Sequence, residues 1–136
     1  MTAGYSGTPL VKKLGLEPGQ KAAFVDAPGH YCERLGPLPE PRRRLQRPGR
    51  DMDFVHFFVR RAARLRDRLP GLKASLGPAG MLWISWPKKA SDLSTEVAEA
   101  DIRSAGLAAG LVDVKICAID DDWSGLKFVY RKEDRW

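Results

Sequence analysis

The sequence predicts an α/β protein built on a mostly parallel sheet that ends in an antiparallel hairpin. Two continuous apolar runs, DFVHFFV at 53–59 and MLWIS at 81–85, are typical of strands buried on both faces. Helical periodicity follows each run, and such alternation favours parallel strands joined by right-handed crossovers. The last two strand-like segments, 111–119 and 126–131, are separated by the short stretch 120–125, which predicts an antiparallel pair.

The N-terminal half supplies the first elements in this order. A short helix is expected at Pro9–Leu14, with Thr8 as its cap. The segment KAAFVD at 21–26 predicts a strand, which Pro28-Gly29 ends. A proline-rich stretch follows, so the region Arg43–Gln46 is at best a short edge strand.

Two longer helices follow the buried strands. Leucines spaced by three and four residues predict a helix through Leu65–Leu76, which Pro70-Gly71 is expected to kink or split and Gly77–Gly80 to end. A second helix is expected over Asp92–Ala109, where alanine and isoleucine recur on one face and Gly110 follows.

Composition predicts a cytoplasmic protein with a single folded domain. The length of 136 residues suffices for one hydrophobic core, and we expect an N-terminal arm with a short helix over 1–15 and an α/β domain over 16–136. No apolar run approaches the ~20 residues of a membrane span, and the N-terminus lacks the layout of a signal peptide, so no membrane contact is expected. Cys32 and Cys117 belong to no CxxC or Cys/His cluster, which predicts reduced thiols and no metal site.

The order of elements resembles a shortened form of the Rossmann-like fold of S-adenosylmethionine-dependent methyltransferases. LEPGQKAAFVDAPG is similar to the first strand and glycine loop of that superfamily, DFVHFFV to its fourth strand, and GLVDVKICAIDDDWSGLKFVYRK to its terminal hairpin. This resemblance implies a three-layer sandwich that lacks one strand–helix unit. More closely, YSGTPLVKKLG, MLWISWPKKAS and the hairpin sequence resemble a family of small bacterial proteins of unknown function, which implies a fold but no reaction.

Departures from the methyltransferase pattern indicate that the cofactor site has been lost. Enzymes of that superfamily follow the first strand with an acid and a GxGxG-like turn, whereas Asp26 is followed by Ala27-Pro28-Gly29-His30. The acid that would hold the ribose hydroxyls has no counterpart before Asp51. We therefore expect no cofactor and a non-catalytic binding or regulatory module for an anionic small ligand or a protein partner. The alternative is an enzyme that keeps a nucleotide-like cofactor in a cleft between Pro28-Gly29-His30 and Trp86-Pro87-Lys88.

Candidate ligand-binding residues follow from the rule that open α/β sheets bind ligands beyond the carboxyl ends of their strands. Most loops at these ends are basic, and Ser91–Ser94 is expected to open a helix whose positive dipole end faces the same edge. The lysines could pair with a phosphate, and Trp86 could either stack on a ring or pack in the core. The candidates are Asp26, Gly29, His30, Arg60, Trp86, Lys88, Lys89 and Ser91.

Other polar and aromatic residues favour a structural interpretation. His56 and Trp83 lie inside apolar strands and are interpreted as core residues. The run Asp120-Asp121-Asp122 is interpreted as a solvated turn, because three consecutive carboxylates do not easily converge on one ion. No nucleophile, zinc or phosphate-loop motif is present, so no catalytic residue is assigned.

Nucleic acid is a further, less favoured partner. The formal net charge is +6, and arginines cluster between residues 42 and 68, which produces a positive field that can attract polyanions. Aromatic residues do not interleave with these arginines, as binding of single strands usually requires.

Overall fold

The sheet is mostly parallel and ends in an antiparallel hairpin, as the sequence predicts. The computed structural model describes residues 9–31, 43–45 and 48–136. The strands are β1 (Lys21–Val25), β2 (Arg43–Leu45), β3 (Met52–Phe58), β4 (Leu76–Pro87), β5 (Leu111–Ala118) and β6 (Trp123–Tyr130). Within the described residues they form one sheet of six strands in the order β2-β1-β3-β4-β6-β5. The four strands from β2 to β4 run parallel, and β6 runs antiparallel to both of its neighbours.

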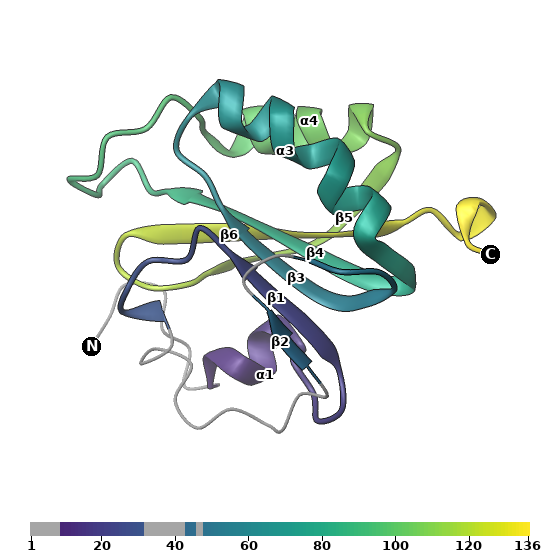
Figure 1. Ribbon diagram of the computed structural model, residues 1–136. Coiled ribbons are helices and arrows are strands. Elements are labelled where there is room, and N and C mark those ends of the chain that lie inside the picture. The colour runs from purple at the N-terminus through teal and green to yellow at the C-terminus, as the bar shows by residue number, and fades with distance from the viewer. Residues whose placement is uncertain (1–8, 32–42, 46–47) are drawn as a thin grey trace.

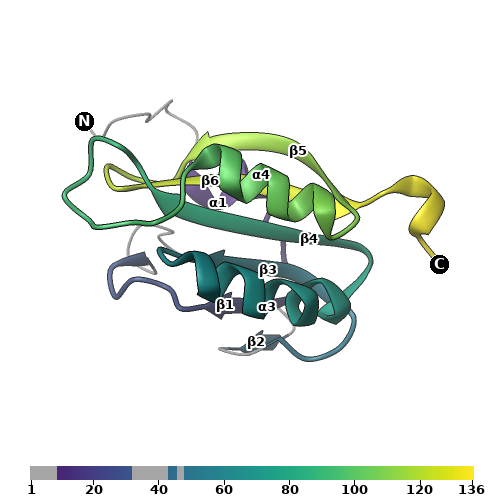
Figure 2. The ribbon, with the colours of Figure 1, turned by 90° about the horizontal axis from the view of Figure 1, so that it is seen from above.

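Helices cover both faces of the sheet and make three layers. The helical segments are α1 (Leu10–Leu14), α3 (Ala62–Ser75), α4 (Glu99–Ala108) and the short η1 (Lys132–Asp134). Figure 1 shows α3 and α4 on one face and α1 on the other, and Figure 2 shows α3 on the β1–β3 side and α4 on the β5–β6 side. The predicted α/β sandwich with a closing hairpin is thus confirmed. Among the helices of the described residues, none is long and apolar enough to span a membrane.

Strand β3 separates two hydrophobic clusters, which explains why apolar residues lie on both of its faces. Val55 and Phe57 face the cluster beneath α3 and α4, whereas Phe54 and Phe58 face the cluster that contains α1. In the second cluster the Trp83 indole Nε1 donates a hydrogen bond of 2.8 Å to the Leu14 carbonyl. Trp83 is therefore a core residue, as predicted, and it holds α1 against the sheet.

The helix α3 and the strand β4 differ from their predicted forms. The helix continues through Pro70, which lies on its exposed side, where water can satisfy the carbonyl that proline leaves without a donor. The strand begins at Leu76 and not at Met81, because Leu76 already pairs with Met52 of β3. An irregularity in the register absorbs the residues between Leu76 and Met81.

The chain changes direction across the sheet between β1 and β3. β2 lies on one side of β1 and β3 on the other, so the connections that leave the carboxyl ends of β1 and β3 diverge. Such a switch point opens a crevice at this edge of the sheet, and open α/β proteins bind their ligands there.

Candidate functional site

A cavity of about 460 Å³ lies at this switch point. Its volume is within the range of roughly 300–1,000 Å³ that is typical of small-molecule sites. We call it the cleft. Its apolar wall consists of Pro28, Phe58, Val59, Leu93 and Trp123. Its polar lining consists of Asp26, His30, Arg60, Arg61, Arg64 and Asp122.

The first side of the cleft is the turn that follows β1. Asp26 has a φ of 57°, a left-handed conformation that Asp adopts more readily than most residues. Its carboxylate accepts two hydrogen bonds from Arg64, from Nε at 3.0 Å and from Nη2 at 3.1 Å. This bidentate pair connects the turn after β1 to α3. It neutralises Asp26, which occupies the position of the acid that follows the first strand in methyltransferases.

Two further guanidinium groups at the cleft have no carboxylate partner among the described residues. Arg60 donates from Nε to the Ser94 carbonyl and from Nη2 to the Ser94 hydroxyl, both at 2.7 Å. The Arg61 side chain makes no hydrogen bond or ion pair within the described part of the chain. Two of the three arginines that line the cleft are therefore not paired with a carboxylate of the described residues.

The predicted helix at Ser91–Ser94 is wrong, because α4 begins only at Glu99. The Ser91 hydroxyl accepts the N–H of Leu93 at 3.1 Å, and the Thr95 hydroxyl accepts the N–H of Val97 at 3.0 Å. Such local side-chain bonds compete with helical hydrogen bonds and keep the segment 88–98 as a loop. The expected helix dipole at this position does not exist.

This loop is instead attached to the start of α3 and forms one rim of the cleft. The Glu96 carboxylate accepts the N–H of Ala62 at 2.9 Å, and the Glu96 N–H donates to the Arg60 carbonyl at 2.7 Å. Glu96 thus caps the first turn of α3, whose own preceding residue, Arg61, provides no side-chain cap. These contacts position Arg60 and Arg61 at the cleft.

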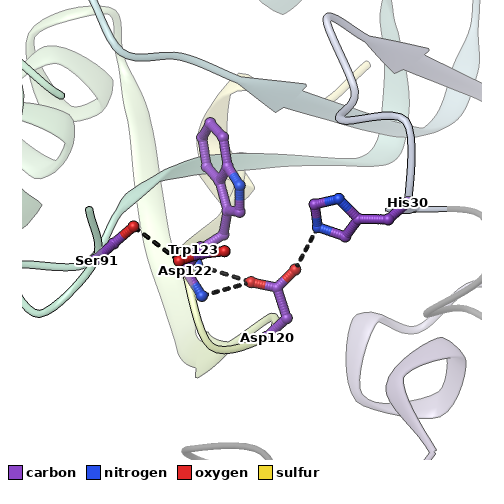
Figure 3. Close-up of polar contacts among 5 residues, drawn as sticks. All are labelled: His30, Ser91, Asp120, Asp122 and Trp123. Carbon is purple, nitrogen blue, oxygen red and sulfur yellow. Dashed lines mark hydrogen bonds and ion pairs between the residues drawn. The ribbon is translucent and has the colours of Figure 1, made fainter. Parts of the chain in front are cut away.

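The turn between β5 and β6 supplies the third side, which Figure 3 shows. Asp120 is buried, and its Oδ1 accepts the backbone N–H of Asp122 at 2.8 Å and of Trp123 at 2.9 Å. Its Oδ2 lies 3.0 Å from the Nε2 of His30. The Ser91 hydroxyl donates to Asp122 Oδ1 at 2.8 Å and so ties the loop to this turn. The prediction of a solvated turn is wrong for Asp120, whose carboxylate organises the turn.

A buried polar network lies beneath the apolar floor of the cleft. His56 is fully buried, with Nδ1 at 2.6 Å from the Tyr31 hydroxyl and Nε2 at 2.7 Å from the Ser85 hydroxyl. Burial lowers the pKa of His56 to about 3. Phe58, which lines the cleft, stacks on this imidazole with a centroid separation of 4.1 Å. His56 is thus a neutral core residue, as the sequence indicates.

The structure brings three of the predicted site residues into the cleft, namely Asp26, His30 and Arg60. Trp86 is 5% exposed and packs in the core beneath α3 and α4. Its two predicted roles were stacking on a ligand ring and packing in the core, and the structure shows core packing. Gly29 lies in the exposed turn, and a Cβ there would meet no atom within 4 Å.

The other predicted residues follow β4 and surround the cleft without lining it. Lys88 donates its backbone N–H to the Asp122 carbonyl at 2.7 Å, and Lys89 is exposed. Ser91 contributes through its bond to Asp122. The sequence analysis did not single out Arg64 or Trp123 for the cleft. Arg64 carried a signal, because it lies in the first turn of the helix that follows β3.

Comparison with known proteins identifies a family and a fold. A protein-family model described as a protein of unknown function, DUF3052, matches residues 50–132. No curated protein sequence matches the chain.

Solved structures similar to this chain include methyltransferases. A magnesium protoporphyrin IX methyltransferase from Synechocystis PCC 6803 superposes with a TM-score of 0.59 at 13% identity, covering 90% of this chain and 78% of the other. An S-adenosylmethionine-dependent methyltransferase from Aquifex aeolicus gives 0.59 at 12% identity, with 88% and 86% covered. A putative methyltransferase from Thermoplasma acidophilum gives 0.61 at 9% identity, with 95% and 77% covered. At these identities the similarity establishes the fold alone.

Proposed function

This chain belongs to the DUF3052 family of proteins of unknown function, and from that premise we propose that it binds an anionic small molecule in the cleft. It would act in the cytoplasm as a binding or regulatory module and not as an S-adenosylmethionine-dependent methyltransferase. The observation that carries this proposal is the pair Arg60 and Arg61, which line the cleft and whose guanidinium groups have no carboxylate partner among the described residues. Guanidinium groups bind carboxylates and phosphates through paired, charge-assisted hydrogen bonds.

The cleft residues do not fit S-adenosylmethionine. Pro28 removes a backbone donor from the loop after β1, and both oxygens of the Asp26 carboxylate already accept bonds from Arg64. The sulfonium of the cofactor is a cation, which Arg60 and Arg61 would repel. The sequence also offers no carboxylate after β2 until Asp51. These departures support a binding function that has diverged from the fold's usual cofactor.

Thermal unfolding with added ligands tests the proposal. Adenosine 5′-monophosphate, acetyl-coenzyme A and S-adenosylmethionine are each added at millimolar concentration. We expect at least one of the two anionic compounds to raise the melting temperature by several degrees, because a ligand at 100 times its Kd stabilises a protein by about 2.7 kcal/mol. S-adenosylmethionine should cause no shift.

A matched pair of variants locates the binding site. Arg61→Gln should weaken binding of the anionic compound by about tenfold or more, because a hydrogen bond to a charged group contributes about 1.5–3 kcal/mol. Arg66→Gln removes the same charge from an exposed position of α3 that does not line the cleft, and should bind like the wild type. The proposal fails if neither anion shifts the melting temperature, or if both variants lose affinity equally.

A further inference from the structure

The turn between β5 and β6 places an unused hydrogen-bond donor at the cleft. The Trp123 side chain is 5% exposed, lines the cleft, and its indole N–H has no acceptor among the described residues. Figure 3 shows the indole nitrogen on the edge of the ring that faces His30. Because a buried donor without a partner is costly, an acceptor at this position would be strongly favoured.

Asp120 orients the imidazole of His30, which supplies a hydrogen-bond acceptor at the cleft. Its Oδ1 is held by two backbone N–H groups, which leaves Oδ2 to accept the proton on Nε2 of His30 at 3.0 Å. A neutral imidazole with its proton on Nε2 has a free lone pair on Nδ1. The His30 side chain is half-exposed and lines the cleft, so this nitrogen is within reach of a ligand.

We propose that His30, Asp120 and Trp123 form a proton-accepting subsite for an aromatic hydroxyl group of the bound ligand. The ligand's O–H bond breaks and its proton bonds to Nδ1 of His30, which becomes an imidazolium paired with the Asp120 carboxylate. The electron pair of the O–H bond stays on the ligand oxygen. That oxyanion accepts hydrogen bonds from the Trp123 indole N–H and the new Nδ1–H.

The chemistry of the cleft selects an aromatic hydroxyl over an aliphatic one. An imidazole takes a proton efficiently only from a group of comparable acidity, which phenols approach and alcohols do not. Phe58, Val59 and Leu93 supply an apolar wall for the ring. The other charged groups that line the same space are Asp26, Arg60, Arg61, Arg64 and Asp122. The inference rests on the proposed function, because it adds a second recognition element to the same anion-binding cleft.

4-Nitrophenol is a suitable probe because its ionised form absorbs visible light. It is titrated with excess protein at a pH below its own pKa, and the ratio of nitrophenolate to nitrophenol is read from the absorbance. We expect this ratio to be at least about tenfold higher for the bound probe than in buffer, which corresponds to a probe pKa lowered by about one unit.

Three substitutions separate a proton acceptor from a merely structural contact. His30→Gln should return the ratio to its value in buffer. Asp120→Asn keeps an oxygen for the two backbone N–H groups but turns an NH₂ toward His30. That change moves the imidazole proton to Nδ1, so the ratio should also fall. Trp123→Phe keeps a ring and removes the donor, and should lower the ratio several-fold, whereas Arg66→Gln should have no effect.

The inference is overturned if 4-nitrophenol does not bind at millimolar concentration, binds with the ratio found in buffer, or gives the same ratio with His30→Gln. The two proposals fail separately. If an anionic compound binds through Arg61 while the nitrophenol ratio does not change, the proposed function stands and this subsite is refuted.

Discussion

The imidazole of His56 lies between Tyr31 and Ser85 in the sheet, and burial lowers its pKa from 6.5 to about 3. In an unfolded chain the same group takes up a proton near pH 6.5. Between these two values the unfolded state binds one more proton than the folded state, so this group opposes folding increasingly as the pH falls. Its effect is absent above the unfolded pKa and complete once the pH reaches about 3.

We expect the free energy of unfolding to show this single-residue effect. The contribution of His56 should fall by about 1.4 kcal/mol per pH unit below pH 6.5. His56→Gln cannot titrate, so its disadvantage relative to the wild type should shrink on acidification, by roughly 3 kcal/mol at about pH 4. Urea denaturation of both proteins across this pH range measures the difference. Parallel curves for the two proteins would contradict the assignment.

At the scale of elements, close packing of α4 against the sheet depends on one small residue. A Cβ at Gly106 would lie 2.1 Å from the ring of Phe128, which is fully buried in β6. Gly71 in α3 differs, because a Cβ there would meet no atom within 4 Å. Both glycines lie inside helices, so the two positions differ mainly in the space available.

Alanine at these two positions should change stability in opposite directions. Gly71→Ala should stabilise the protein by up to about 1 kcal/mol, because alanine favours the helix. Gly106→Ala gains the same propensity but forces a buried ring aside, and we expect a net loss of about 1–3 kcal/mol. Thermal and urea denaturation of both variants measure these changes. A stabilised Gly106→Ala variant would show that α4 can move away from the sheet at little cost.

The elements also show what local sequence can and cannot specify. Strong periodic signals gave the correct type of each long element, from the buried strand β3 to the hairpin of β5 and β6. The error at Ser91–Ser94 has a distant cause as well as a local one. Arg60 binds Ser94 and Glu96 across 34 to 36 residues of sequence, and these contacts hold the segment as a loop.

Across the whole molecule, the fold class could be predicted because it follows from the alternation of elements and from a resemblance. The cleft could be predicted only in part. Asp26, His30 and Arg60 were predicted from their places at strand ends. Their partners were not, because Arg64 lies 38 residues from Asp26 and Asp120 lies 90 residues from His30 in the sequence. No local pattern records such pairings, and only the folded chain decides which charges in the cleft are neutralised.

Two variants with the same net charge test this distribution of charge, because only one of them loses a carboxylate that lines the cleft. Asp26→Asn releases the Arg64 guanidinium into the cleft, and Asn tolerates the φ of 57° at this position. The exposed ion pair that is lost contributes at most about 1 kcal/mol, so the variant should fold. Asp67→Asn removes one carboxylate from an exposed position of α3 that does not line the cleft.

We expect adenosine 5′-monophosphate to bind Asp26→Asn about tenfold more tightly than the wild type, a gain of about 1.4 kcal/mol. Asp67→Asn should stay within about twofold of the wild type, since this carboxylate is exposed, does not line the cleft and is screened by salt. Isothermal titration at low and high salt measures both, and the gain should shrink as salt rises. If both variants gain affinity equally, the phosphate responds to the overall field of a basic protein. If both variants bind with the affinity of the wild type, Arg64 does not reach the ligand.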